Sequence, residues 1–453
     1  MKNKITPSLT WILYFISATC ALATMPALSV ENQAIIFFIF VAASAKASEK
    51  GGILHPISWF GIFFFLYSTS YPLLYSTQGG TSENIKSVIP LSFSAYIIFC
   101  LSVLLTAPST RPSLPPSIFS KRFLSFLLWP CLAVCTTLAF IAATSGASSK
   151  RDFLNYAEEK NISSLFIFFI ISALIYALAL LEKFKDPSKT AFPKILLDKQ
   201  GIAILSIFLI AFGATGERDY IFRLLLLIML IAFSTRYKYK YYYLIASSIA
   251  LVLILPLTQA AKSYLLADQI IYEGYQAGDI FNTEFASAGK NIFYVIDRNI
   301  TGYNGETLIY DLKRYFDFIF SDQQSTVSWF NNYIRGIFRE DGTAGWGFSL
   351  VAEGYINFGY IGPALIFLII GLATGIVYRL SQKNSAYFGF YILYIPSLIY
   401  VIRADIGNYL SIIFKVNLII ILLVFISGKI WHALQKKETT RQKFQTKHLP
   451  QNQ

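Results

Sequence analysis

The sequence predicts an all-α integral membrane protein with about twelve transmembrane helices and one large loop outside the membrane. Of its 453 residues, 55% are hydrophobic and only 14% are charged, a balance typical of polytopic membrane proteins and unlike that of soluble domains. Hydrophobic stretches long enough to cross a bilayer follow one another along nearly the whole chain. The one long polar interruption covers residues 261–348, late in the sequence.

Each predicted span is a continuous hydrophobic stretch bounded by polar or charged residues. The spans lie near residues 9–28, 33–45, 57–74, 88–107, 123–143, 163–182, 201–215, 219–234, 243–260, 349–379, 386–402 and 409–428. A cleaved signal peptide is a competing interpretation of the first span, because Lys2 and Lys4 precede it and Ala21-Leu22-Ala23 lies within it. The hydrophobic stretch continues past that point, which favours a membrane span.

The net charge of +13 invites a nucleic-acid function, but the distribution of the charge indicates membrane topology instead. With the N-terminus in the cytoplasm and about twelve spans, about 23 of the 38 Lys and Arg fall on the cytoplasmic side, against about five acids. The basic segments on that side are 46–50, 111–122, 183–199, 236–240, 379–383 and 429–447. We therefore expect both termini to be cytoplasmic and the large loop to be external.

The predicted organisation has four parts. Residues 1–260 form transmembrane helices 1–9, residues 261–348 form the large external loop, residues 349–428 form helices 10–12, and residues 429–453 form a polar cytoplasmic tail. Within the loop, Asn291 to Ile300 and Thr307 to Ser321 carry apolar residues at helical spacing. These stretches predict short amphipathic helices that lie on the membrane surface.

No residue pattern points to a metal, a cofactor or a disulfide. All four cysteines lie in hydrophobic spans, and the three histidines, His55, His432 and His448, all lie outside the large loop. The sequence also lacks an Asp-x-Asp motif that would hold a divalent metal against a phosphate donor; Glu217-Arg218-Asp219 is the nearest pattern. We expect neither metal nor cofactor.

Ionisable residues within spans or at their external ends are the candidate functional residues. Charges there are energetically unfavourable, and so they usually form ion pairs or take part in function. Arg218 lies in the Gly-rich turn Gly213 to Asp219, whereas Asp219 and Arg223 are four residues apart and are expected to neutralise each other. At the last external turn, Arg403 and Asp405 form either a local salt bridge or part of a site.

A polar stripe follows the large loop directly. Its members, spaced to share one helical face, are Ser349, Glu353, Asn357 and Tyr360. Such a stripe must face the interior of the bundle or a wet cavity. Interhelical hydrogen bonding is the alternative interpretation.

Arginine is well suited to bind a pyrophosphate, because its planar guanidinium donates parallel hydrogen bonds and stays charged. Four arginines in the loop, Arg298, Arg314, Arg335 and Arg339, lie among eleven loop acids. External arginines therefore indicate a lipid-linked phosphate ligand. Aromatic residues near them could stack on sugars, although anchoring at the membrane interface explains them equally well: Trp329, Phe330, Tyr333 and Trp346.

Taken in order, these features resemble those of the bacterial O-antigen polymerases (the Wzy family) and related oligosaccharide repeat-unit polymerases. The resemblance lies in about twelve spans, the large loop between the ninth and tenth, the Gly216-Glu217-Arg218-Asp219 turn and the stretch from Ala352 to Pro363. At the level of residues it covers about Gly342 to Gly375. It implies a metal-independent, integral-membrane glycosyltransferase of the C type at the periplasmic face of the bacterial inner membrane.

By this resemblance, the enzyme transfers a growing glycan from undecaprenyl pyrophosphate to a new lipid-linked repeat unit. Arg218 and Arg335 are then expected to bind the donor pyrophosphate, with Arg218 catalytic, and Glu353 to orient or deprotonate the acceptor hydroxyl. The further expected substrate-binding residues are Arg298, Tyr355, Asn357 and Arg403. The expected partners are undecaprenyl-pyrophosphate-linked glycans, membrane lipid, a chain-length-regulating co-polymerase and a flippase.

Three alternatives remain at this stage. O-antigen ligases share this layout but use a His in the large loop, which this chain lacks. A flippase or other transporter would be expected to show internal repeats, and none is found. A structural or regulatory membrane protein is the third alternative.

Overall fold

The computed structural model describes residues 9–108, 118–145, 156–183, 199–215, 219–234, 285–316, 326–338 and 347–447. Within these ranges the protein is all-helical and contains no β-strand. Eight helical segments of the described chain are long and apolar enough to cross a membrane, and two shorter apolar helices accompany them. The chain is thus an all-α protein suited to a membrane. A total of twelve spans stays a prediction, because the expected span 243–260 lies outside the described residues.

The described part of the first half contains α1 (Leu9–Thr24), α2 (Val30–Ala47), α3 (Pro56–Thr77), α4 (Val88–Thr106), α5 (Lys121–Thr144), α7 (Ile167–Lys183), α9 (Lys199–Thr215) and α10 (Asp219–Ser234). The second half contains α12 (Ala286–Asp297), α13 (Glu306–Tyr315), α14 (Thr326–Phe338), α15 (Leu350–Phe358), α16 (Gly362–Ser381), α17 (Ser385–Val401), α18 (Ile406–Leu410), the π-helix η7 (Ser411–Leu418) and α19 (Ile419–Lys447).

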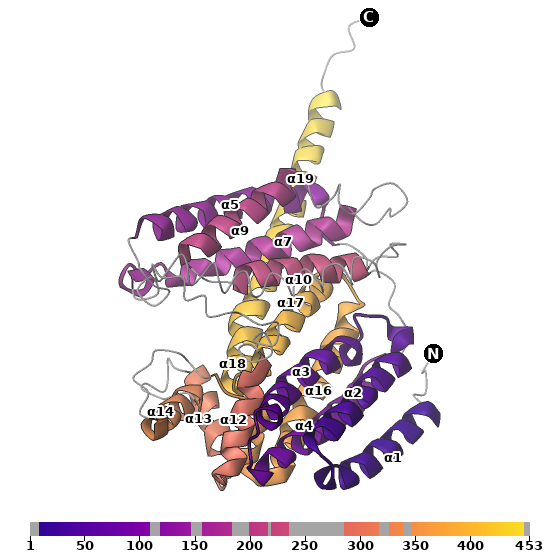
Figure 1. Cartoon of the computed structure of the whole chain (residues 1–453). Coiled ribbons are helices and arrows are strands. Elements are labelled where there is room, and N and C mark those ends of the chain that lie inside the picture. Colours follow the sequence, from indigo (N-terminus) through magenta and orange to yellow (C-terminus); the bar gives the residue numbers. More distant parts are fainter. Residues whose placement is uncertain are drawn as a thin grey trace, which may run out of the picture.

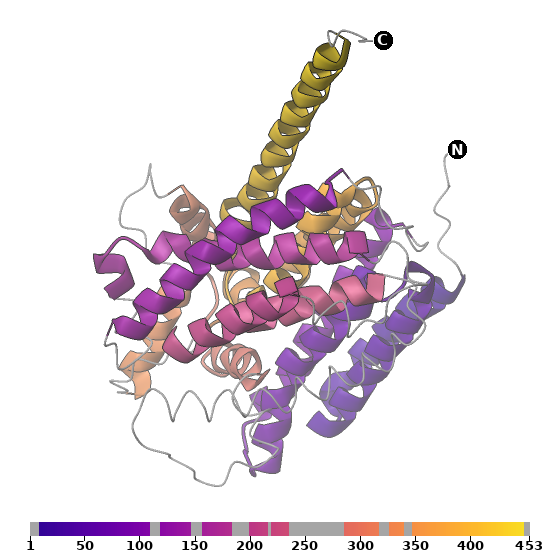
Figure 2. The same ribbon diagram turned by 90° about the horizontal axis from the view of Figure 1, so that it is seen from above.

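The helices form two groups (Figure 1). One group joins α1 to α4 with α12, α15 and α16, and the other joins α5, α7, α9 and α10. Helix α17 contacts members of both groups. After the turn that follows α17, the last span begins as α18, passes through η7 and continues as α19, which projects beyond the other helices in both views (Figures 1 and 2).

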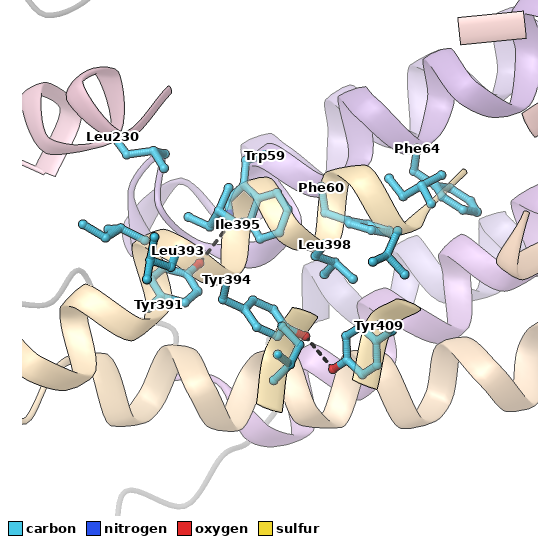
Figure 3. Close-up of a cluster of buried hydrophobic side chains, with 14 of the residues drawn as sticks. Trp59, Phe60, Phe64, Leu230, Tyr391, Leu393, Tyr394, Ile395, Leu398 and Tyr409 are labelled. Carbon is cyan, nitrogen blue, oxygen red and sulfur yellow. Dashed lines mark hydrogen bonds between the residues drawn. The ribbon is translucent and has the colours of Figure 1, made fainter. Parts of the chain in front are cut away.

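Helix α17 joins the groups because its side chains are apolar on every side but carry a few hydroxyls. Figure 3 shows it between Trp59 and Phe60 of α3 and Leu230 of α10. The indole nitrogen of Trp59 donates to the Tyr391 hydroxyl at 3.0 Å, and the hydroxyls of Tyr394 and Tyr409 lie 2.9 Å apart. The Tyr391 hydroxyl in turn donates to the Leu54 carbonyl, so each of these buried hydroxyls has a hydrogen-bond partner, as is usual for buried polar groups.

Helices α4 and α16 approach each other unusually closely. A Cβ atom on Gly371 would lie 2.7 Å from Cβ of Ser102 and 2.9 Å from the carbonyl oxygen of Phe99. Gly375, one turn later, faces Thr106 in the same way. Small residues at this spacing allow two backbones to touch, which is how helices associate in lipid without a hydrophobic driving force.

The predicted span 349–379 is not one continuous helix. Helix α15 ends at Phe358, Gly359 adopts a φ of 60°, and α16 starts at Gly362. The chain folds back here: a Cβ on Gly354 would lie only 2.5 Å from the backbone nitrogen of Pro363. With nine residues, α15 is about 14 Å long, less than half of a bilayer's hydrocarbon thickness. It is therefore a short helix folded against α16.

Three short helices, α12 to α14, precede α15 in the segment expected to be the large loop. Helix α12 packs against α3, where a Cβ on Gly289 would lie 3.2 Å from the carbonyl oxygen of Tyr67. Its residues are mostly buried, so α12 belongs to the body of the protein. Helix α13 contacts α18, α14 and α15. Residues 317–325 lie outside the described part of the chain.

Candidate functional site

Three members of the predicted polar stripe lie on the buried face of α15. Ser349, Glu353 and Asn357 are each at most 1% exposed. The fourth, Tyr360, does not belong to this face: it lies beyond the end of α15 and is 62% exposed. The helix stops at Gly359 because that residue takes a left-handed conformation, and so the helical spacing that linked Tyr360 to the stripe is lost.

Glu353 has hydrogen-bond partners on both carboxylate oxygens. Oε2 accepts from the backbone nitrogen of Ile406 at 2.8 Å, and Oε1 accepts from the Thr307 hydroxyl at 3.4 Å. Ile406 is the first residue of α18, so Glu353 fills the place of a helix-capping group from a different part of the chain. Through these hydrogen bonds, the buried Glu353 links α15 to α13 and α18.

Two aspartates complete this arrangement. Asp311 accepts from the backbone nitrogens of Thr326 at 3.2 Å and Gly407 at 3.1 Å. Asp405 accepts from Asn408 at 2.7 Å and from the backbone nitrogen of Val327 at 3.1 Å. Both aspartates are fully buried. We call Glu353, Asp311 and Asp405 the carboxyl junction, because together they bind the N-terminal amides of α14 and α18.

Helix N-termini favour carboxylates, since their unpaired N–H groups carry partial positive charge. That attraction offsets only part of the cost of burying three acids together, as Asp311 illustrates. Burial, reinforced by the negative charge of Asp405, raises the pKa of Asp311 to about 6, and the amides of Thr326 and Gly407 act in the opposite direction. Among the described residues, no group of His, Cys, Asp and Glu has the arrangement of a metal site.

Asn357 fastens the loop between α12 and α13 to the end of α15. Its side-chain nitrogen donates to the Thr307 hydroxyl at 2.6 Å, and its side-chain oxygen accepts from the Gly305 amide at 3.0 Å. The amides of Tyr303 and Asn304 donate to the carbonyls of Ile356 and Asn357. The predicted substrate ligand Asn357 therefore makes structural bonds on both ends of its amide.

The arginines predicted to bind substrate occupy different settings. Arg218 lies outside the described residues. Arg298 is exposed at the C-terminal end of α12, and Arg335 lies on α14. Arg403 is half-buried with its guanidinium 5.5 Å from the centre of the Tyr400 ring, and its carbonyl accepts from the Phe348 amide at 3.1 Å.

The carboxyl junction connects the elements that bear two of these arginines. Asp405, two residues after Arg403, binds the start of the helix that carries Arg335. By contrast, Asp219 and Arg223 form the expected local pair, with Nε and Oδ2 2.5 Å apart. The predicted substrate ligand Tyr355 is 4% exposed and meets the Tyr360 ring edge-on at 5.3 Å.

The aromatic residues of the loop separate into buried and accessible ones. Phe330 is fully buried against Phe348, with 4.7 Å between ring centres. Trp329 and Tyr333 stack at 5.8 Å with an interplanar angle of 20°, and the Tyr303 ring meets Trp329 edge-on at 5.3 Å. Trp346 lies outside the described residues.

Sequence reasoning missed Asp311 and Thr307 as members of the site. Both lie on the inward face of α13, at i and i+4, and are at most 4% exposed. The apolar residues predicted to face the membrane surface are exposed: Leu312 is 48% and Phe316 37% exposed. The i to i+4 spacing of two polar residues was visible in the sequence, but their direction depends on partners elsewhere in the chain.

Comparison with known proteins yields no match, whether to family models, to curated proteins or to solved structures.

Proposed function

We propose that this chain is a metal-independent glycosyltransferase that polymerises undecaprenyl-pyrophosphate-linked repeat units into O-antigen or a related surface polysaccharide. The reaction takes place at the periplasmic face of the bacterial inner membrane. An acceptor hydroxyl attacks the anomeric carbon of the donor glycan, that carbon's bond to the pyrophosphate oxygen breaks, and undecaprenyl pyrophosphate leaves. The acceptor's proton passes to solvent or to a base.

The observation that carries the proposal is the folding of the stretch that resembles the polymerases. Helix α15 lies within it, is too short to span a bilayer and turns a buried polar face to α13 and α18. In membrane proteins, interrupted helices with polar faces are tolerated where they are enclosed by protein or line a polar site. Such an arrangement supports a reaction centre at the membrane boundary.

In this proposal, arginines stabilise the pyrophosphate as negative charge develops on it. Arg218 remains the leading residue, and Arg335 and Arg403 lie on elements that the carboxyl junction ties together. Glu353 acts as a positioning residue, since both of its oxygens already accept hydrogen bonds. Arg298, Tyr355 and Asn357 stay candidates for substrate contact or for its support.

The outward apolar face of α13 supports placement of this segment on the membrane surface. Ile309 is 51% exposed and Leu312 48%, while the opposite face carries the buried Asp311. A helix with polar residues toward protein and apolar residues outward suits the interface between headgroups and acyl chains.

Gene deletion tests the reaction. We expect lipopolysaccharide core bearing one repeat unit and loss of the long ladder on gels, because a polymerase acts only after the first unit. Bare core without any repeat would identify a ligase and overturn the proposal. Loss of purified activity in EDTA would overturn the metal-independent mechanism.

Arg218→Lys and Arg218→Ala test the arginine mechanism. Both are expected to express normally and to lower polymerisation by about 10²–10³, because Lys cannot reproduce bidentate donation. Arg122→Lys, at an exposed arginine in the first turn of α5, is the matched control and should leave the ladder unchanged. A normal ladder from Arg218→Ala would exclude a catalytic role for Arg218.

The proposed topology, with cytoplasmic termini and a periplasmic 261–348 segment, can be tested with single cysteines. In a background that lacks the four native cysteines, a membrane-impermeant thiol reagent should label Gln276→Cys but not Thr439→Cys on intact spheroplasts. The reverse pattern would contradict this topology.

A further inference from the structure

Three aromatic rings, two on α14 and one on the loop that precedes α13, form a small surface that the carboxyl junction does not use. Trp329 and Tyr333 lie one turn apart on α14 and stack nearly parallel, and Tyr303 closes one side edge-on. Tyr333 is 39% exposed, and Trp329 and Tyr303 are half-buried. We call these three residues the aromatic platform.

Backbone hydrogen bonds hold the loop that carries Tyr303. The loop that carries Tyr303 has left-handed residues at Asn299, Gly302, Asn304 and Gly305. Its amides donate to the end of α15: Tyr303 to the Ile356 carbonyl at 3.2 Å and Asn304 to the Asn357 carbonyl at 3.1 Å. A loop held in this way presents the Tyr303 ring in one position.

Hydrogen bonds and packing also hold the start of α14. The first amides of α14 donate to Asp311 and Asp405, and Phe330 is buried against Phe348. Trp329 is therefore fixed between two anchored neighbours in the chain. Rings that are held in place before a ligand arrives lose little conformational entropy when they bind it.

A carboxylate and hydroxyls border the rings. The Glu306 amide donates to the Tyr303 carbonyl at 2.8 Å, so the exposed Glu306 side chain starts on the same turn. Burial raises the pKa of Tyr303, and the charges of Tyr333 and Glu306 raise it further. Glu306 thus begins on the same hydrogen-bonded turn as Tyr303, and the two tyrosines of the platform supply hydroxyls of their own.

The residues around the platform argue for a sugar and against lipid. On α14 the exposed neighbours of Trp329 are the polar Ser328 and Asn332, whereas α13 exposes Ile309 and Leu312. Only the α13 surface has the composition of a lipid contact. A pyranose ring has a face of C–H groups, which pack on the negative face of an aromatic ring, and hydroxyls at its edge.

We propose that Tyr303, Trp329 and Tyr333 form a binding platform for a pyranose ring of the glycan, with Glu306 accepting hydrogen bonds from its hydroxyls. The identity of that glycan as a lipid-linked repeat unit rests on the proposed function. The platform itself is a carbohydrate site formed by α14 and the loop that precedes α13.

Binding to the full-length protein in nanodiscs tests the platform without requiring catalysis. The probe is the repeat-unit oligosaccharide released from its lipid by mild acid, followed by saturation-transfer NMR and titration. Trp329→Ala and Tyr333→Ala are expected to weaken binding about tenfold or more, and Trp329→Phe by no more than about threefold, since Phe keeps a ring. Trp129→Ala, which removes a 51% exposed ring on α5, is the matched control.

Unchanged affinity in both alanine variants, at unchanged unfolding temperature, would overturn the platform. So would quenching of Trp329 fluorescence by brominated lipid but not by oligosaccharide, because that result makes Trp329 a membrane anchor. Trp329 fluorescence is isolated by subtracting the signal of Trp329→Phe. Affinity that rises with the number of linked repeats identifies the growing donor chain as the occupant, and constant affinity identifies the acceptor. The ladder in cells is scored separately, since it reports the polymerase reaction and not glycan binding.

Discussion

Two contacts in this protein hold helices together by opposite means. At α4 and α16, Gly371 and Gly375 let two backbones touch, and dispersion attraction between small residues stabilises the contact. At the carboxyl junction, Glu353, Asp311 and Asp405 hold four helices by accepting hydrogen bonds from backbone amides. The first contact is sensitive to added volume and the second to the loss of a polar partner. Substitutions of those two kinds should separate them.

The largest effect is expected from Glu353→Ala. It leaves the partly buried Ile406 amide without its acceptor and removes a fully buried side chain, so it should lower the free energy of unfolding by about 3 kcal/mol. Glu353→Gln keeps the shape and an acceptor oxygen and should cost much less. Thermal unfolding in detergent, followed by a thiol-reactive dye at the buried Cys100, Cys131 and Cys135, measures both. Equal losses in the two variants would show that hydrogen bonding is not what the junction contributes.

The glycan ladder made by Glu353→Gln in cells tests whether Glu353 also takes part in the reaction. A positioning role predicts a ladder close to that of the wild type. Loss of the ladder at an unchanged unfolding temperature would instead assign proton transfer to Glu353.

Gly371→Ala tests the volume-limited contact. Its Cβ would lie 2.9 Å from a backbone oxygen that cannot move without shifting α4, so we expect a loss of about 2–3 kcal/mol. Gly213→Ala is the matched control, because a Cβ on this helical glycine meets nothing within 4 Å. The unfolding temperatures of the two variants provide the measurement. Because Ala favours a helix over Gly, Gly213→Ala should not lower the unfolding temperature. The same loss at both positions would show that contact with α4 is not the cause.

The stability of the carboxyl junction should depend on pH, whereas the glycine contact between α4 and α16 contains no titratable group. Because the pKa of Asp311 is raised from 3.8 to about 6, its protonated form is the one that the folded state favours. Its contribution to stability is full below about pH 4 and is lost as the pH rises through about 6, and about 2 kcal/mol of it is lost between pH 4.5 and pH 7. The wild type should therefore gain stability between pH 7 and pH 4.5 relative to Asp311→Asn, which cannot titrate. Parallel curves for the two proteins would contradict the raised pKa.

The smallest effect is expected from Ser349→Ala. Its hydroxyl accepts from the Val351 amide at 3.2 Å and caps α15, so its loss should cost about 1 kcal/mol. Ser29→Ala, which removes an exposed cap of α2, should cost less because water replaces the hydroxyl. A larger loss at Ser29 would mean that burial does not amplify the cost of a missing cap.

Hydrophobic patterning predicted the positions of most helices because length and apolarity are local properties of the chain. It missed the break at Gly359, since the stretch from Gly354 to Gly362 is apolar almost throughout and hydropathy is blind to a positive φ. The number of spans and their orientation stay predictions, because length and composition indicate that a helix can cross a membrane but not where the bilayer lies.

The polar stripe of α15 was predicted as far as its own helix extends. Its partners were not, because Glu353 bonds to residues 46 and 53 positions away and Asp311 to one 96 positions away. Spacing within a helix carries no information about such distant partners. The capping role of Asp405 had a local signal, an aspartate three residues before Asn408 at a helix start, and that signal competed with the interpretation of Asp405 as the partner of Arg403.

The carboxyl junction also sets an order of events during synthesis. Glu353 and Asp311 are made before the turn at Ile406 and Gly407 that supplies their amide partners. Until the ribosome has delivered that turn and it has been inserted, two carboxylates lack the donors that make their burial tolerable. Helices α13 and α14 can therefore dock in full only after α18 has been made. A nascent chain that stops short of Asp405 is expected to leave these two helices undocked.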